Sequence, residues 1–172
     1  MRKLIFVAVV AAMLITLTAC ADTPPPPAPK VVATRVRTTT PQPANDEEAI
    51  RQLVFAEGQA TVEQDIDRLQ AMWDKDGVVA DANRTPDNPS DDKTWKGWAA
   101  IRDRYINIVF PSNPQNAEHP NTRVTIAGDT ATVVSDTKIG ATNEKDNDKW
   151  TFRKMDGQWK MTSLTFGLAP RR

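Results

Sequence analysis

One stretch decides the fold class of this chain: Trp150-Thr151-Phe152-Arg153-Lys154-Met155-Asp156-Gly157-Gln158-Trp159-Lys160. It holds the dipeptide Asp156-Gly157 between two β-rich segments, 149–155 and 158–166. An Asp-Gly pair between alternating strands is among the strongest short signals for a β-hairpin. The stretch therefore predicts two antiparallel strands joined by a tight turn.

A second pair of β-rich segments lies upstream of this hairpin. Residues 122–127 and 130–139 flank Gly128-Asp129, and their apolar residues follow a period of two. Together the two pairs predict four strands in an antiparallel meander.

The part of the chain before residue 111 has helical periodicity instead. Asn45 or Asp46 can cap a helix whose first turn is acidic, as the helix dipole favours. The apolar residues at helical spacing in this segment are Ile50, Leu53, Val54 and Ala60, with Phe55 beside them. This pattern predicts a long amphipathic helix.

Two further helices are expected before the strands. Asp65 can cap a short helix that ends at Gly77 and turns four residues inward: Ile66, Leu69, Met72 and Trp73. A short strand, 78–81, and an exposed polar loop, 83–93, follow. A third helix fits 98–110, where apolar residues recur at every third or fourth position until Pro111.

Helices first and strands afterwards predict the α+β class, with a sheet wrapped against the helices. Residues 46–168 are enough for one domain with a single core and too few for two. The sequence contains no internal repeat.

This order of elements resembles the nuclear transport factor 2-like superfamily, also called the SnoaL-like or cone-shaped α+β fold. The segments that carry the likeness are the capped helix 47–53, the helix restart 65–69 running into Trp73, the strand 77–81, the helix after Gly97 and the hairpin 150–160. The resemblance implies about three N-terminal helices packed on a curved, mainly antiparallel sheet, with a pocket in the open end of the cone. Members include isomerases, dehydratases, cyclases and an epoxide hydrolase, and also non-enzymatic binding modules that often dimerise through the sheet.

The N-terminus is typical of an exported protein. Arg2 and Lys3 precede an apolar run, 4–17, of the length that a secretory signal needs. The run closes with Leu17-Thr18-Ala19-Cys20, which resembles the bacterial lipobox. The resemblance implies cleavage between Ala19 and Cys20 and a lipid on Cys20, which would be the membrane anchor.

Four regions follow from these assignments. They are a signal peptide (1–19), a lipidated cysteine with a Pro/Thr-rich disordered linker (20–45), the folded domain (46–168) and a short tail (169–172). We expect an extracytoplasmic, lipid-anchored protein. In a bacterium with two membranes, Ala21 after the cysteine favours the outer membrane, facing the periplasm.

Composition argues against several classes of function. The chain has 22 basic and 22 acidic residues and one cysteine, so neither nucleic-acid binding nor a disulfide framework is expected. It contains no Gly-rich phosphate loop, nucleophile elbow or spaced Ca²⁺ loop. We therefore expect no metal and no cofactor.

The candidate site residues are few. Asp81 at a strand end and Asp136 within a strand are the candidate bases, although turn or solvent-facing roles are commoner for such residues. Tyr105 and His119 are the only tyrosine and histidine. Tyr105 could polarise a substrate carbonyl in the pocket, although core packing is the usual role at its position. His119 is a candidate catalytic residue, although it looks like a residue that enters a strand. Trp95 and Trp98 are candidates for a pocket rim or an interface.

Because none of these residues forms a motif, the leading hypothesis is a membrane-anchored, non-catalytic module that binds a small hydrophobic ligand or an envelope protein, as a possible homodimer. The alternative is an isomerase, dehydratase or hydrolase that uses a pocket aspartate as general base. An accessory subunit of an envelope complex is a third possibility.

Overall fold

The computed structural model describes residues 43–169, and the first two predicted helices are present in it. Helix α1 (Asp46–Glu63) begins after Asn45, whose side chain accepts a hydrogen bond from the Glu48 backbone N–H at 2.9 Å. Helix α2 (Ile66–Met72) begins after Asp65, which caps the Arg68 N–H in the same way. Both predicted caps are confirmed.

The segment after α2 differs from the prediction. Strand β1 (Trp73–Asp81) begins directly after Met72, so the helix does not continue to Gly77. Trp73 is buried in an extended conformation and pairs with Met161, which shows that sheet pairing outweighs the helical pattern here. The predicted polar loop ends in an unpredicted strand, β2 (Lys93–Lys96), which pairs with β1.

The third helical segment changes geometry along its length. Helix α3 (Gly97–Arg104) continues into a π-helical turn, Tyr105–Val109, and a 3₁₀ turn, Phe110–Ser112. Single π turns inside helices are frequent at functional sites. This one begins at Tyr105.

The four predicted meander strands are present and form most of the sheet. They are β4 (Arg123–Ala127), β5 (Thr130–Ile139), β6 (Thr142–Met155) and β7 (Gln158–Phe166), and β6 is longer than predicted. The short strand β3 (Ala117–Glu118) also pairs with β5. The strand order is β2-β1-β7-β6-β5-β3, with β4 on β5. Among these seven strands of the described part of the chain, β1 and β7 pair in parallel and the other pairs are antiparallel.

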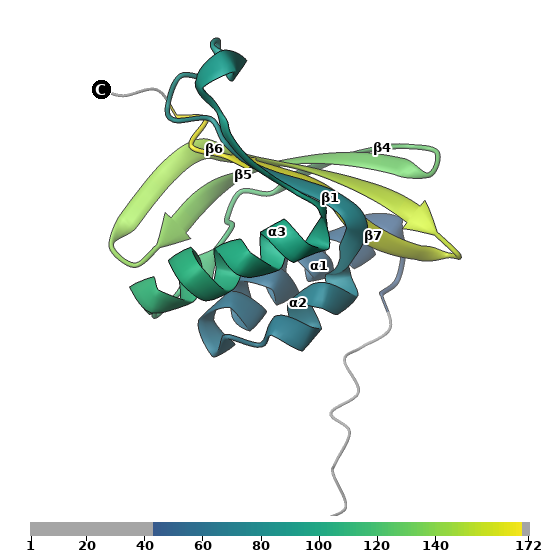
Figure 1. The fold of residues 1–172 in the computed structure, drawn as a ribbon. Helices are drawn as coiled ribbons and strands as arrows, with labels where there is room; N and C mark the ends of the chain where they lie inside the picture. The colour runs from purple at the N-terminus through teal and green to yellow at the C-terminus, as the bar shows by residue number, and fades with distance from the viewer. Residues whose placement is uncertain (1–42, 170–172) are drawn as a thin grey trace, which may run out of the picture. The chain divides into compact units, whose positions relative to one another are not determined.

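The three helices cover one face of the twisted sheet (Figure 1). Between the two layers lies a core whose largest fully buried side chains are Trp150, Tyr105, Phe152, Ile50, Leu69, Ile101 and Met161. The predicted α+β class, with helices packed on a curved and mainly antiparallel sheet, is confirmed. Phe55, expected beside the apolar face of α1, is 64% exposed.

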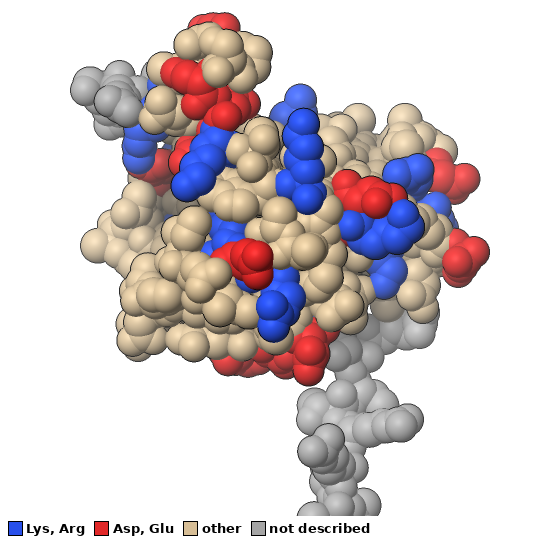
Figure 2. Space-filling view, in the orientation of Figure 1, with Lys and Arg blue, Asp and Glu red and all other residues tan. Residues whose placement is uncertain are grey.

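The predicted signal peptide, Cys20 and most of the linker lie outside the described residues. From residue 43 to residue 169, no helix has the length and apolar character needed to span a membrane. On the face of the domain seen in Figure 2, acidic and basic side chains are interspersed.

Candidate functional site

A cavity of about 150 Å³ lies between the helices and the sheet. Residues of α1, the α3–π segment, β5, β6 and β7 line it, together with the segment around β3. Its polar and ionisable lining comprises Glu57, Thr61, Arg104, Tyr105, His119, Thr137, Asn147 and Asp148, and its apolar lining includes Val109, Ile139, Leu164 and Phe166.

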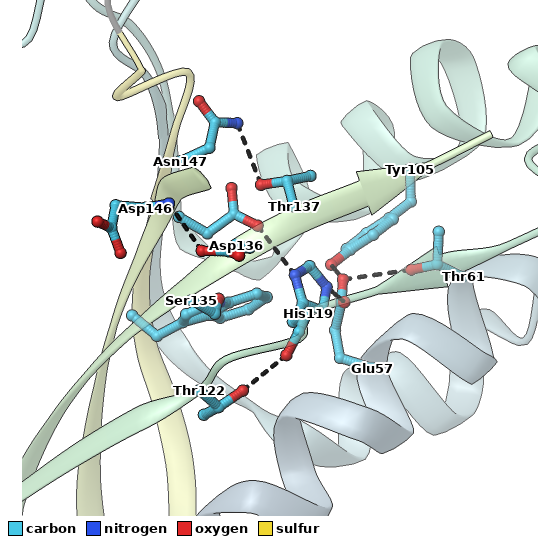
Figure 3. Close-up of polar contacts among 12 residues, drawn as sticks. Glu57, Thr61, Tyr105, His119, Thr122, Ser135, Asp136, Thr137, Asp146 and Asn147 are labelled. Atoms are coloured by element: carbon cyan, nitrogen blue, oxygen red, sulfur yellow. Dashed lines mark hydrogen bonds and ion pairs between the residues drawn. The ribbon is translucent and has the colours of Figure 1, made fainter. Parts of the chain in front are cut away.

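The imidazole of His119 lies between the carboxylates of Asp148 and Glu57. Figure 3 shows the His119 ring facing Glu57. Its Nδ1 is 2.9 Å from Asp148 Oδ2, and its Nε2 is 3.5 Å from Glu57 Oε2. The ring also meets the Trp150 ring edge to face, with centroids 5.1 Å apart. The side chain of His119 is only 6% exposed.

Two hydrogen bonds fix the backbone of the segment between β3 and β4, which carries His119. Thr122 Oγ1 donates to the His119 carbonyl at 2.6 Å, and the next carbonyl, that of Pro120, accepts from the Asp136 N–H at 3.0 Å. Asp136 sits at a register shift between β5 and β6, where the regular alternation of the strand is broken. The bulge in β5 therefore supports the loop that carries the histidine.

Glu57 receives two hydroxyl donors, one from its own helix α1 and one from the π turn that follows α3. Tyr105 donates to Glu57 Oε1 at 2.6 Å and Thr61 donates to the same oxygen at 3.2 Å. Burial alone would raise the pKa of Glu57, but His119 and these hydroxyls hold that pKa below its usual value. Glu57 is therefore a buried carboxylate at neutral pH.

His119 carries a positive charge in this setting. Burial alone would lower its pKa, but the hydrogen bonds and charges of Asp148 and Glu57 raise the pKa to about 9. Burial and the charge of Glu57 raise the pKa of Tyr105, so its hydroxyl stays protonated. At neutral pH the cavity thus holds the Glu57 carboxylate next to an imidazolium and a neutral phenol.

Two of the four predicted catalytic residues line the cavity and two do not. Tyr105 and His119 are in the lining, whereas Asp81 and Asp136 are absent from it. Asp81 Oδ1 accepts from the Asn83 N–H at 2.9 Å, which is a turn contact. Asp136 accepts from the Asp146 N–H and from Asn121 Nδ2, and these bonds lower its pKa.

The two candidate tryptophans are partly buried and pack against the core. Neither lines the cavity. The Trp95 ring lies 5.1 Å from the guanidinium carbon of Arg104, so it contacts the site through a cavity-lining residue.

Sequence reasoning missed Glu57 and Asp148, although a signal existed for each. Glu57 follows Val54 by three residues and Leu53 by four, so it shares the inward stripe of α1. Asp148 precedes the inward Trp150 by two residues and therefore points to the same face of β6. The run Asp146-Asn147-Asp148 has the polarity of a solvated loop, but it belongs to strand β6.

The chemistry that this lining offers is proton transfer. Within residues 43–169, no group of three or more His, Cys, Asp or Glu side chains has an arrangement that could hold a metal ion. The carboxylate and imidazolium can instead accept and donate a proton within one small cavity.

Comparison with known proteins agrees with this architecture. A sequence profile of the SnoaL-like domain matches residues 42–165, and no match was found among curated proteins. A nuclear transport factor 2-like protein from Novosphingobium aromaticivorans, with a cystatin-like fold, is 24% identical with a TM-score of 0.56, over 70% of this chain and 79% of that one.

Two other solved structures share the fold. A hexachlorocyclohexane dehydrochlorinase from Novosphingobium barchaimii is 18% identical with a TM-score of 0.51, over 69% of this chain and 83% of its own. A nuclear transport factor 2-like protein from Streptomyces avermitilis, proposed to be a dehydratase, is 20% identical with a TM-score of 0.54, over 76% and 99%. Because the profile match spans well over half of the chain, this protein belongs to the SnoaL-like domain family.

Proposed function

We propose that the domain is an acid–base enzyme of the isomerase or dehydratase type, acting on a small molecule in the 150 Å³ cavity. The observation that carries this proposal is the position of His119 between Glu57 and Asp148. A purely structural core would have no reason to gather two carboxylates, a histidine and a tyrosine around a cavity, since burying charges is unfavourable. This arrangement favours the enzyme over the non-catalytic module.

The two groups that would move protons are Glu57 and His119. Both hydroxyl hydrogen bonds fall on Glu57 Oε1, so Oε2 is the oxygen available to take a proton from a carbon next to a carbonyl. The His119 Nε2–H would donate to the substrate oxygen that gains electron density. In isomerisation that oxygen is the carbonyl, and in elimination it is the leaving hydroxyl, which departs as water.

The site returns to its starting state without an outside reagent. After the transfer, Glu57 is protonated and His119 is neutral, and their facing atoms are 3.5 Å apart. After elimination, a proton passing from Glu57 to His119 restores the carboxylate and the imidazolium. In isomerisation, Glu57 returns its proton to a different carbon of the enol and the enol oxygen returns its proton to His119, which restores the same two forms. Asp148, bonded to Nδ1, would orient the ring and favour its charged form.

The chemistry of two proteins with this fold is compatible with the proposal. A dehydrochlorinase removes hydrogen chloride and a dehydratase removes water. Both reactions need a base at carbon and a path for the leaving group, which the pair Glu57 and His119 could supply.

The test is deuterium exchange at carbon. The full-length protein, purified in detergent, would be incubated with hydroxyacetone or pyruvate in D₂O and followed by ¹H NMR. We expect exchange about a hundredfold faster than with Glu57→Gln or His119→Gln, and an unchanged rate with the control Asp81→Asn, which lies outside the cavity lining. A wild-type rate equal to that of the two cavity variants would refute the proposal.

A binding module is the second candidate, and a larger groove favours it. The groove measures about 590 Å³ and lies between α1, α2 and the β6–β7 turn, with Leu53, Met72 and Trp159 in its lining. Grooves of this size and apolar character hold small molecules or peptides. Ligand binding there, in a protein without exchange activity, would favour this candidate.

We further propose that the protein is a lipoprotein of the bacterial cell envelope, anchored through lipid on Cys20. The support is the apolar run followed by Leu17-Thr18-Ala19-Cys20. The outer-membrane location and the homodimer stay predictions.

A further inference from the structure

Two cavity-lining residues carry buried polar atoms without a partner. Within residues 43–169, three buried side-chain nitrogen or oxygen atoms lack a hydrogen bond, and two of them are Arg104 Nε and Asp148 Oδ1. Buried polar groups in folded proteins are almost always paired. Arg104 Nε–H lacks an acceptor and Asp148 Oδ1 lacks a donor. The two atoms therefore point to a ligand that supplies both partners.

Arg104 is unusual because its contacts are aromatic rather than acidic. Its guanidinium carbon lies 4.6 Å from the Phe166 ring centroid, 5.1 Å from that of Trp95 and 5.9 Å from that of Tyr105. No described residue forms a hydrogen bond or an ion pair with its side chain. Ring contacts hold the guanidinium in place but leave its N–H donors unused.

Glu57 and Asp148, the two carboxylates that line the same cavity as Arg104, contact other residues. Glu57 accepts from Tyr105 and Thr61 and faces His119, while Asp148 accepts from His119 through Oδ2. These acids act on Arg104 only at longer range, where they partly offset the lowering of its pKa by burial. The guanidinium therefore stays charged, without an anion bound to it.

We propose that the cavity binds a small hydroxy acid, with its carboxylate on Arg104 and its hydroxyl donating to Asp148 Oδ1. A guanidinium presents parallel N–H donors that match the two oxygens of a carboxylate. The volume of about 150 Å³ corresponds to roughly five water molecules, which suits a compound of three or four carbons. The proposal names the substrate class of the site described under Proposed function and rests on it.

Binding can be tested without turnover. Isothermal titration calorimetry of the full-length protein in detergent would compare lactate and 3-hydroxybutyrate with their uncharged amides and with propionate, which lacks the hydroxyl. We expect each hydroxy acid to bind at least tenfold more tightly than its amide and than propionate. Equal binding of acid and amide, or no binding of either hydroxy acid, would overturn the proposal.

Arg104→Met tests the role of Arg104, because it keeps an apolar side chain and removes the guanidinium group. We expect at least a tenfold loss of hydroxy-acid binding with an equal or higher Tm, because an unpaired buried cation is removed. Arg102→Met, on the same helix and 50% exposed, is the matched control and should bind normally. A Tm several degrees lower in Arg104→Met, or binding that is unchanged, would assign Arg104 a structural role and contradict the proposal.

The two proposals fail in different ways. His119→Gln should abolish deuterium exchange while hydroxy-acid binding remains within a few fold of wild type. Arg104→Met should weaken binding of the acids, whereas exchange of the wild-type protein into the neutral probe hydroxyacetone, which has no carboxylate, reports proton transfer separately. Exchange without hydroxy-acid binding would refute only the substrate class, and binding without exchange would refute only the enzyme.

Discussion

Gly58 of α1 meets the backbone of Ala117 so closely that a Cβ on the glycine would lie 2.1 Å from the Ala117 carbonyl oxygen. Glu57 is the neighbour of this glycine, and His119 follows Ala117 by two residues. The contact between the two backbones therefore sets how near the histidine comes to the glutamate.

Gly58→Ala should destabilise the domain, although the same change usually stabilises a helix by about 1 kcal/mol. The added methyl group would overlap the Ala117 carbonyl, which is backbone and cannot rotate away as a flexible side chain could. Overpacking of this kind costs about 1–3 kcal/mol. Chemical denaturation would measure the change. The neighbouring exposed change Gln59→Ala is the control and should stay within about 0.5 kcal/mol of wild type. A more stable Gly58→Ala protein would contradict the close contact.

The stability of the domain should fall as pH rises through the range in which His119 loses its proton. The folded-state pKa of about 9 exceeds the ordinary value of 6.5, so this contribution is complete below about pH 6.5 and is lost by about pH 9. It amounts to roughly 3 kcal/mol. Thermal unfolding between pH 6 and 10 would show it, and His119→Gln should flatten the curve over that range.

Glu57 determines how the stability of the domain changes at acidic pH. Its pKa is below the ordinary 4.5 in the folded state, so its contribution is present above about pH 4.5 and is lost as pH falls further. We expect Glu57→Gln to weaken this decline. The combined profile should have its maximum between about pH 4.5 and 6.5, and a maximum above pH 8 would contradict the charge assignment.

Asp148→Asn should lower the pKa of His119 more than Glu57→Gln does. Asp148 is the nearer partner, at 2.9 Å against 3.5 Å, and it contributes the stronger hydrogen bond to the charged ring. We expect a fall of about 1–2 pH units for Asp148→Asn, measured by NMR titration. Asp146→Asn is the matched control, because that side chain is 44% exposed and pairs with Arg123 instead.

Cys20→Ser tests the membrane anchor separately from the domain. Without the thiol no lipid can be attached, so the protein should leave the membrane fraction or accumulate unprocessed. Fractionation and metabolic labelling with a fatty acid would measure this. Unchanged labelling of Cys20→Ser would contradict lipidation at that residue, and the folded domain would be unaffected in either case.

Much of the fold could be predicted from local patterns. Both helix caps, the hairpin turn at Asp156-Gly157 and the strand order β4 to β7 follow from residues close together in the sequence. Strand β2 and the start of β1 at Trp73 could not be predicted, because they depend on pairing with distant segments. Tertiary contacts override local propensity in such places.

The site was harder to predict than the fold. His119 and Tyr105 stood out as single residues of their type, but their partners Glu57 and Asp148 belong to elements far apart in the sequence. Regular alternation of the strand predicts that Asp136 faces outward with Thr132 and Lys138, yet its side chain is buried. The bulge beside Asp136 breaks that alternation. The carboxylate oxygens of Asp136 then accept hydrogen bonds from the Asp146 N–H and from Asn121 Nδ2.

The most direct measurement is the NMR titration of the His119 ring, which needs no resonance assignment because the chain has one histidine. The protein would carry no tag, or a tag without histidine, so that His119 is its single imidazole. With ¹⁵N-labelled histidine it would be titrated from pH 5 to 10. We expect a ring protonated on both nitrogens at pH 7, with a pKa of about 9. A neutral ring at pH 7, with a pKa at or below the ordinary 6.5, would contradict the arrangement of His119 between Glu57 and Asp148.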